Sequence, residues 1–352
     1  MAGLAGKKIL IRADASPGIG SGHVMRQIVL AEKLRESGAE IIFASRNHGG
    51  SNYAVIKERG FTLRLLPPPP MPFVKEDYAS WLGEVPALDV EQSFDGANFN
   101  ACIIDHYGAR ADWQNAARKF AGKIIVMDDE GLEKFDCDLL VNQNYFPQGA
   151  AFYDGKVPQG CKILQGPEYA LLRPEFAKAR GGVSARKNLE HLLILMGGND
   201  VYGVGQKIIE NLDENIRVTW VTGPQYSGAL PAGKENVTVL KSSNDVAALM
   251  ANADFCIGAA GTTSWERCCL KLPSALFVLA DNQRAIAQNL HDIGAAYNLG
   301  DVGAYDFSEI KSLVSHYQDD QNALKAMSEK AGALVDGLGA ARVCEAIEEI
   351  MQ

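Results

Sequence analysis

Hydrophobic and polar positions along the chain repeat with two periods, that of buried strands and that of helices. The short apolar run KKILIRAD begins at Lys7, the Gly-rich turn PGIGSG follows, and HVMRQIVLAEKLRESG then repeats apolar residues at helical spacing until Gly38. These three segments predict a β-loop-α unit. Further strand-like runs, mostly separated by helix-length segments, lie at 39–46, 61–67, 100–107, 123–129 and 138–145. This alternation predicts a parallel sheet covered by helices.

A second α/β pattern follows residues 179–187, whose glycines and basic residues indicate a linker. Its predicted strands lie at 190–198, 216–223, 237–242, 253–261 and 273–280, and its predicted helices near 203–212, 244–253, 263–272 and 282–294. A chain of 352 residues is long enough for two domains that each bury a core. We therefore expect an α/β fold of two Rossmann-like domains, residues 1–178 and residues 188–352, the second of which ends in helices. Ligands of open α/β sheets bind beyond the carboxyl ends of strands, so two such domains facing one another are expected to hold a ligand in a central cleft.

One segment of the first domain breaks this alternation. Residues 67–85 are PPPPMPFVKEDYASWLGEV, and four consecutive prolines cannot join a central strand. We interpret residues from about 67 to 99 as an insert on the surface of the first domain.

Composition and charge narrow the classes of function. The formal net charge of -9 and the lack of a long Lys/Arg run argue against nucleic acid as a partner. No run of 18 apolar residues is present and MAGLAGKKIL leads directly into a strand, so we expect a cytoplasmic protein without stable membrane insertion. The seven cysteines include no C-x-x-C pair, and the histidines at 48, 191, 291 and 316 lie at no metal-ligand spacing. We therefore predict neither a disulfide framework nor a bound metal, and the oligomeric state stays open.

The Gly-rich turn before the first predicted helix is the first candidate site. Its glycines, among them Gly20 and Gly22, let a ligand approach the backbone, and the helix N-terminus offers unpaired N–H groups to an anion or a polar sugar. His23 falls in the first turn of that helix, where the helix dipole favours the neutral imidazole that a general base requires. A structural, helix-capping histidine is the alternative. A dinucleotide site is disfavoured because the spacing is not G-x-G-x-x-G and the second strand ends in Ser45-Arg46, without an acid for the ribose.

Two turns of the second domain are the next candidates. The stretch Gly197-Gly198-Asn199 ends a predicted strand, and paired glycines can cradle a diphosphate through main-chain N–H groups. Gly261 and Thr262 begin a second such turn, and Glu266, one helical turn further, can accept hydrogen bonds from a ribose diol. The alternative is an ordinary strand-to-helix turn with a capped helix and a solvated glutamate.

Two more polar stretches follow predicted strands. Asn282 and Gln283 come after the strand at 273–280, where they can contact sugar hydroxyls or amides, or cap the next helix. The stretch Asp105-His106-Tyr107 ends a strand of the first domain and is expected to face the same cleft. Its alternative role is a buried hydrogen-bond network that supports the sheet.

Seven separated motifs, taken in order, carry a family resemblance. They are RADAS, IGSGHVMR, IIDHY, GPEYALLRPEF, LMGGND, AAGTTSWE and LADNQ, and they run from about residue 7 to 295. Together they resemble the UDP-2,4-diacetamido-2,4,6-trideoxy-β-L-altropyranose hydrolases of pseudaminic acid biosynthesis. That family is similar to the two-domain GT-B glycosyltransferases but uses water as the acceptor. The resemblance implies a GT-B-like fold and inverting cleavage of the anomeric C–O bond with release of UDP, without a required metal or cofactor.

The resemblance also implies roles for individual residues. It places the base on His23, sugar contacts on Tyr107 and Asn282, and UDP contacts on Gly197, Gly198, Gly261, Thr262 and Glu266. We add Asp14, Gly20, Gly22, Asn199 and Gln283 as candidate substrate contacts, with Asp14 as the next base to test. Asn199 departs from the Ser or Thr that is common in the G-G-x-D stretch of the family.

Residues 300–352 carry no motif of the family, although the last helix of a GT-B fold often returns to the first domain. Two other functions stay open. One is a GT-B glycosyltransferase, for which Met71, Phe73 and Trp81 of the insert are candidates for an acceptor surface. The other is a non-catalytic module that binds a nucleotide sugar.

Overall fold

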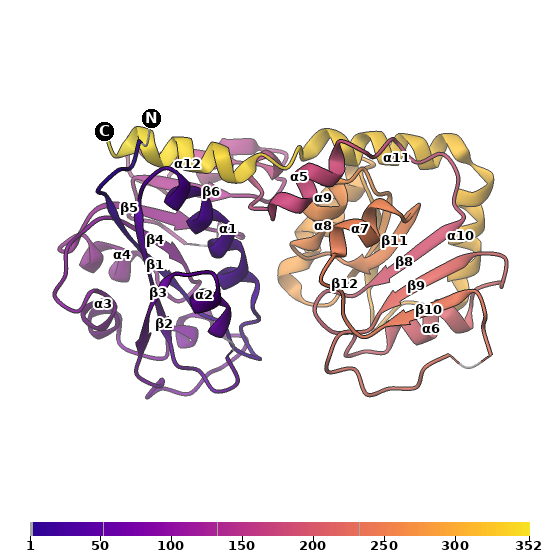
Figure 1. Ribbon diagram of the computed structural model, residues 1–352, viewed down its shortest axis with the longest axis horizontal. Helices are drawn as coiled ribbons and strands as arrows, with labels where there is room; N and C mark the ends of the chain where they lie inside the picture. The colour runs from indigo at the N-terminus through magenta and orange to yellow at the C-terminus, as the bar shows by residue number, and fades with distance from the viewer. Residues whose placement is uncertain (1–2, 52, 132, 232) are drawn as a thin grey trace. The chain divides into compact units, whose positions relative to one another are not determined.

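The computed structural model describes residues 3–51, 53–131, 133–231 and 233–352. Contacts between Cα atoms divide the chain into two compact units, a first unit of Met1–Leu171 with Leu338–Gln352 and a second unit of Leu172–Gly337. Each unit contains a parallel β-sheet accompanied by helices (Figure 1).

The described residues of the first unit form a sheet with the strand order β3-β2-β1-β4-β5-β6-β7, in which every neighbouring pair is parallel. Its strands are β1 (Lys8–Ala13), β2 (Glu40–Arg46), β3 (Thr62–Leu66), β4 (Phe99–Asp105), β5 (Ala121–Met127), β6 (Leu139–Asn142) and β7 (Lys162–Gln165). Its helices are α1 (Gly22–Glu36), α2 (Ala54–Glu58), α3 (Pro86–Phe94), α4 (Ala111–Ala117) and α12 (Gly339–Ile350), with 3-10 turns η1 (Tyr78–Leu82), η2 (Gly149–Tyr153) and η3 (Pro167–Tyr169). The strand order reverses between β1 and β4, so the switch point where α/β sheets bind ligands lies at the carboxyl ends of these two strands.

The second unit repeats this topology, with the strand order β10-β9-β8-β11-β12-β13 in its described residues and parallel pairs throughout. Its strands are β8 (His191–Leu195), β9 (Arg217–Val221), β10 (Val237–Leu240), β11 (Phe255–Ala259), β12 (Ser274–Val278) and β13 (Tyr297–Asp301). Its helices are α5 (Pro174–Arg180), α6 (Val204–Glu210), α7 (Val246–Ala251), α8 (Thr263–Cys269), α9 (Arg284–Asp292), α10 (Ile310–Asp319) and α11 (Gln321–Leu334), with 3-10 turns η4 (Asp281–Gln283) and η5 (Phe307–Glu309). The switch point of this sheet lies at the carboxyl ends of β8 and β11.

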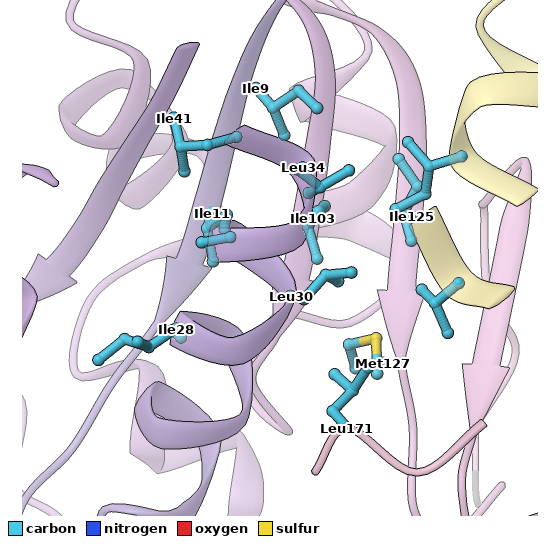
Figure 2. Packing of buried hydrophobic residues seen from close by; sticks show 14 of the residues in the cluster. Ile9, Ile11, Ile28, Leu30, Leu34, Ile41, Ile103, Ile125, Met127 and Leu171 are labelled. Carbon is cyan, nitrogen blue, oxygen red and sulfur yellow. The ribbon is translucent and has the colours of Figure 1, made fainter. Parts of the chain in front are cut away.

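The strands predicted from apolar runs are all present, while β7 and β13 were not predicted. Both are short, and Gly300 interrupts the apolar character of β13. Alternate residues of each strand point to opposite faces of the sheet. On one face of the first unit, side chains of α1 lie against those of β1 and β4, as Ile28, Leu30 and Leu34 show in Figure 2.

The last helix belongs to the first unit rather than to the second, where the predicted boundary of 188–352 placed it. Its apolar residues Val343, Ala346 and Ile347 form one stripe at helical spacing, and they are buried in the same cluster as Leu34 of α1. This burial explains the return of the chain to the first unit.

The predicted linker at 179–187 is likewise part of a unit. The side chain of Arg186 is buried and donates hydrogen bonds to the carbonyl groups of Ala253 and Leu270, which fixes the segment to the second unit. Arg180 and Arg186 therefore satisfy backbone carbonyls, whereas Lys187 is exposed.

The insert is only partly a surface loop. Met71, Phe73 and Val74 are exposed, but α3 packs against α4, and its residues Val90 and Phe94 join a buried cluster. Helix α3 also carries Asp89, a buried carboxylate that accepts hydrogen bonds from Arg12 and Arg46. Residues 86–94 thus belong to the core of the first unit.

Candidate functional site

The turn after β1 places His23 in the first turn of α1. Gly20 has a φ of 85°, a left-handed conformation that favours glycine, and its N–H donates to the carbonyl of Ser16 at 2.7 Å. Ser21, at the N-cap of α1, makes no side-chain cap hydrogen bond. The turn therefore exposes the helix N-terminus and holds the His23 side chain at the carboxyl edge of the sheet.

Asp105, the last residue of β4, fixes the orientation of His23. One carboxylate oxygen, Oδ1, lies 2.7 Å from His23 Nδ1, and the side chain of His23 is 11% exposed. A protonated Nδ1 is the tautomer that this carboxylate favours, and it leaves Nε2 as the acceptor. The pair therefore has the arrangement of a general base and its orienting carboxylate.

A buried network of charges keeps Asp105 ionised. Arg26 donates to both carboxylate oxygens of Asp105, at 2.7 and 2.6 Å, and Gln27 donates to Oδ2 at 2.8 Å. Burial by itself raises the pKa of the Asp105 carboxyl, but the charge of Arg26 and these hydrogen bonds hold that pKa well below its usual range. Asp129 binds the other side of the Arg26 guanidinium at 2.8 and 2.9 Å.

Tyr107 lies beside His23 and belongs to the same network. Its ring is perpendicular to the imidazole with a centroid distance of 4.9 Å, and its hydroxyl donates to Asp129 at 2.7 Å. Burial and the neighbouring Asp129 raise the pKa of the Tyr107 phenol well above its ordinary value, so it stays a neutral donor. The structure thus brings together the predicted residues His23 and Tyr107.

The insert supplies an aromatic wall to this group. The rings of Tyr78 and Trp81 lie 4.9 and 5.6 Å from the ring of Tyr107, and Phe73 lies 5.6 Å from Trp81. Phe73 also reaches the Gly-rich turn, where a Cβ atom on Gly18 would lie 2.6 Å from its ring. The insert therefore packs against both sides of the candidate site in the first unit.

An open pocket borders Tyr107 on the carboxyl side of β4 and β5. It is lined by Tyr78, His106, Tyr107, Ala109, Arg110, Gln114, Val126, Met127, Asp128, Glu130, Glu133 and Phe135. Burial raises the pKa of the Asp128 and Glu130 carboxyls above their ordinary values. The pocket thus combines an apolar lining with polar groups beside Tyr107.

Asp14 does not join the candidate site as predicted. Its side chain is fully buried, it forms an ion pair with Arg12, and it accepts a hydrogen bond from the Arg46 N–H at 2.7 Å. Burial alone would raise the pKa of the Asp14 carboxyl, but Arg12 and hydrogen bonds from His106 and His48 hold it well below its usual range. A carboxylate with these partners is structural, because it has neither access to a ligand nor a tendency to take up a proton.

In the second unit, Gly197, Gly198 and Asn199 follow β8 at its switch point. Gly197 has a φ of 83°, and the region around it would accommodate a Cβ without contact within 4 Å. Asn199 Oδ1 accepts the Gln225 N–H at 2.9 Å, so its side chain ties the turn to the segment after β9. Both glycines are free to present main-chain N–H groups, whereas Asn199 has a structural contact that competes with a ligand.

Gly261 and Thr262 follow β11, and Glu266 lies one turn into α8. Desolvation raises the pKa of the Glu266 carboxyl to about 7, against the charge of Arg173, whose Nη2 atom is 3.7 Å away. Arg267 is buried and donates a hydrogen bond to the Ala259 carbonyl at 2.7 Å, which fixes α8 to the end of β11. This turn therefore combines an open helix start with a carboxyl group that changes its charge near neutral pH.

Asn282 and Gln283 lie in η4. Gln283 Oε1 accepts the Leu279 N–H at 3.0 Å, and its Nε2 lies 3.8 Å from where a Cβ on Gly261 would stand. Gln283 is therefore adjacent to the Gly261 turn, and Asn282 beside it is exposed. The structure brings Gln283 together with Gly261. The predicted residues His23 and Tyr107 lie in the first unit, and those of the turns after β8 and β11 lie in the second.

Sequence reasoning missed Arg26, Gln27 and Asp129, and it named Asp105 without the contact that this carboxylate makes with His23. Arg26 and Gln27 lie three and four positions after His23, on the same face of α1. Asp105 is the last residue of β4, and Asp129 lies two positions after the end of β5. Helical spacing places Arg26 and Gln27 on the face of α1 that carries His23, but no sequence signal pairs this face with the acids that follow β4 and β5.

Over the described ranges no group of three or more His, Cys, Asp or Glu side chains is arranged to hold a metal ion. A bilayer-spanning helix is also not found among the residues that the structure describes.

Comparison with known proteins supports the resemblance carried by the motifs. The chain is 27% identical to the UDP-2,4-diacetamido-2,4,6-trideoxy-beta-L-altropyranose hydrolase of Campylobacter jejuni over 289 residues, which are 80% of this chain and 94% of that protein. It is a distant relative of this hydrolase. The spore coat polysaccharide biosynthesis protein SpsG of Bacillus subtilis is 23% identical over an alignment of 362 positions, which covers 97% of this chain and 98% of that protein. A family described as "Protein of unknown function (DUF354)" matches residues 197–346.

Comparison with solved structures identifies the fold of the chain. The MurG protein of Acinetobacter baumannii aligns with a TM-score of 0.69 at 17% identity, over 97% of this chain and 99% of that one. The glycosyltransferase of kitacinnamycin aligns with a TM-score of 0.67 at 15% identity, over 98% and 99% of the two chains. The predicted GT-B-like α/β fold is confirmed.

Proposed function

We propose that the protein hydrolyses a UDP-sugar at the anomeric C–O bond, with inversion and release of UDP. The observation that carries the proposal is the contact of 2.7 Å between His23 Nδ1 and Asp105, which leaves Nε2 as a proton acceptor beside Tyr107. The resemblance to the Campylobacter jejuni hydrolase suggests the UDP-2,4-diacetamido-2,4,6-trideoxy-β-L-altropyranose substrate and a place in pseudaminic acid biosynthesis.

The reaction needs a base, a positioned water and donors for the leaving group. His23 Nε2 takes a proton from water while the water oxygen forms the new bond to the anomeric carbon. The old bond to the β-phosphate oxygen breaks, and its electron pair leaves with UDP. Asp105 stays ionised and stabilises the imidazolium that forms, as the carboxylate of a catalytic triad does.

The proposal assigns UDP to the second unit. Main-chain N–H groups at Gly197, Gly198 and Gly261, with the hydroxyl of Thr262, are suited to the growing negative charge of the diphosphate. Glu266 is suited to accept hydrogen bonds from the ribose diol, and Asn282 to contact the sugar. A helix N-terminus and main-chain donors can bind this charge without a metal, so we expect turnover in the presence of a chelator.

The reaction class is tested by incubating the purified protein with UDP-sugars in water labelled with oxygen-18. Cleavage of the C–O bond puts the label in the released sugar, and cleavage of the P–O bond puts it in UDP. We expect His23→Asn to bind UDP normally and to lower turnover by about two to four orders of magnitude. The exposed His316, which lies in the second unit, gives the matched control His316→Asn, for which we expect normal turnover. Label in UDP, or near-normal turnover of His23→Asn, contradicts the mechanism.

A UDP-sugar glycosyltransferase is the second candidate, and the aromatic wall of the insert favours it. Phe73, Tyr78 and Trp81 gather beside Tyr107, and Phe73 is 38% exposed, as an acceptor platform would be. The two functions separate in one assay. A hydrolase releases free sugar at a rate that added acceptors leave unchanged, whereas a transferase releases UDP only when a suitable acceptor is present.

A further inference from the structure

Two free thiols of the first unit contact one another away from His23. The sulfur atoms of Cys137 and Cys161 are 3.6 Å apart. Cys137 precedes β6 and Cys161 immediately precedes β7, and these strands are parallel neighbours with Leu139 opposite Lys162. The Lys162 N–H donates to the Asp138 carbonyl at 2.9 Å, so the backbone between the two cysteines is held in register.

The surroundings of the two thiols differ in a way that suits stepwise oxidation. Cys137 is buried, whereas Cys161 is half-buried and can meet a small molecule from solvent. A hydrogen bond from the Cys137 thiol lowers the pKa of Cys161, which makes Cys161 the better nucleophile of the two. The distance between the sulfur atoms exceeds that of a disulfide, about 2.05 Å, by an amount that small side-chain rotations can close.

We propose that Cys137 and Cys161 form a redox modification site that a low-molecular-weight disulfide, such as oxidised glutathione, converts into an intramolecular disulfide. The thiolate of Cys161 attacks one sulfur of the small disulfide and releases one small thiolate, which takes up the proton that Cys161 lost. The Cys137 thiol then loses its proton and attacks the Cys161 sulfur of the mixed disulfide, which releases the second small thiol. Two protein thiols are oxidised, and one small disulfide is reduced to two thiols.

The crosslink would close a segment that supports the network around Arg26. Between the two cysteines, Asn144 donates to the Asp129 carbonyl at 2.9 Å, and the Tyr153 hydroxyl donates to Asp128 at 2.5 Å. Asp129 in turn binds Arg26 and the Tyr107 hydroxyl. A covalent link at the base of this segment restricts its unfolded conformations, and the folded contacts that brace Asp129 are stabilised as a result.

The test equilibrates the full-length protein with reduced or oxidised glutathione and needs no substrate. Peptide mass spectrometry without reductant is expected to find Cys137 linked to Cys161, with the loss of two hydrogens. The oxidised protein is expected to unfold about 5 to 10 °C above the reduced protein, the effect of closing a loop of this size. This readout does not depend on the UDP-sugar reaction, so its failure leaves the proposed function untouched.

Variants separate the proposed pair from the other thiols. In Cys161→Ser and in Cys137→Ser the difference in melting temperature between the oxidised and reduced forms is expected to vanish. In Cys344→Ala, which changes a buried cysteine of α12, the difference is expected to persist. The proposal is overturned if Cys161 carries only a stable mixed disulfide with glutathione, or if the linked protein melts at the same temperature as the reduced protein.

Discussion

Glu266 is expected to weaken the folded protein at neutral and basic pH, so that Glu266→Gln stabilises the second unit. The carboxyl lies at the start of α8, its side chain is 17% exposed, and burial raises its pKa from 4.5 to about 7. Below about pH 4.5 the group is protonated in both the folded and the unfolded chain and affects stability little. As pH rises toward 7 the unfolded chain loses the proton first, and the folded state is progressively destabilised.

The size of the effect follows from the shift. The rise from 4.5 to about 7 spans roughly 2.5 pH units, and at about 1.4 kcal/mol per unit the charged carboxylate costs the folded state about 3 kcal/mol above pH 7. Glutamine keeps the shape of the side chain and carries no charge, so Glu266→Gln should recover most of that free energy. For a unit of the size of Leu172–Gly337 this corresponds to a rise in melting temperature of about 5 to 10 °C.

The assay is thermal unfolding of the wild type and Glu266→Gln at pH 5 and at pH 8, with Glu235→Gln as an exposed control from the same unit. The stabilisation by Glu266→Gln should be nearly complete at pH 8 and fall to about a quarter of that at pH 5, and the control should show no such change. A variant that melts at or below the wild type at pH 8 would refute the reasoning, because the carboxylate would then be stabilised by Arg173 more than it is penalised by burial.

The same substitution should cost affinity for the nucleotide. If the Glu266 carboxylate accepts the hydrogen bonds of the ribose diol, its loss should weaken binding of a UDP-sugar by about 10- to 100-fold at pH 8. A UDP-sugar is the better ligand for this titration, because the terminal phosphate of free UDP itself ionises near pH 6 to 7. Wild-type affinity should rise between pH 6 and pH 8, and the affinity of Glu266→Gln should not.

Further predictions concern both units. Asp105→Asn should lower turnover by about two to four orders of magnitude without loss of UDP affinity, because the amide can hold the wrong tautomer of His23 and cannot stabilise its imidazolium; equal rates for variant and wild type would contradict this role. Gly223→Ala should weaken binding of a UDP-sugar at least tenfold, because its Cβ would lie 2.4 Å from the Gly198 carbonyl oxygen, while Gly233→Ala, also at positive φ but without neighbours within 4 Å, should not; titration calorimetry compares the two. Turnover should survive excess EDTA, and activity that returns only with added magnesium or manganese would show that a metal carries the diphosphate charge.

The sequence predicted the strands of both sheets other than β7 and β13, because buried parallel strands are continuous apolar runs, a signal that needs no knowledge of neighbours. It predicted that His23 and Tyr107 face the same site because each follows a strand that reaches the carboxyl edge, and the structure places their rings in contact. The sequence assigned the last helix, α12, to the wrong unit. This helix is amphipathic, and its apolar stripe could have packed against either unit. The contacts with α1 decide that question, and they join residues more than 300 positions apart, such as Ser37 and Cys344.

The charge network escaped prediction for a related physical reason. Arg26 and Asp129 are separated by 103 positions, and neither residue type is itself diagnostic of a site. Asp14 shows the opposite error, since its place after the first strand suggested a ligand contact. The pairing with Arg12 and His106 that removes it from solvent depends on the neighbouring strands. The sequence thus predicts which side chains lie at a switch point. Whether such a side chain supports the fold or contacts a ligand depends on its partners from other segments of the chain.

The β-turn-α element that carries the candidate residues has a different charge environment in each unit. This difference supports the proposal that the first unit carries the base and the second unit binds the diphosphate. In the first unit the cation that follows the turn, Arg26, is neutralised by Asp105 and Asp129, so it adds little attraction for a phosphate and serves to orient His23. In the second unit Arg267 contacts neutral oxygens, and the acid beside it, Glu266, is about half protonated near pH 7. The second turn therefore presents less negative charge to a diphosphate than its sequence implies, and the first turn is the one that carries the proposed base.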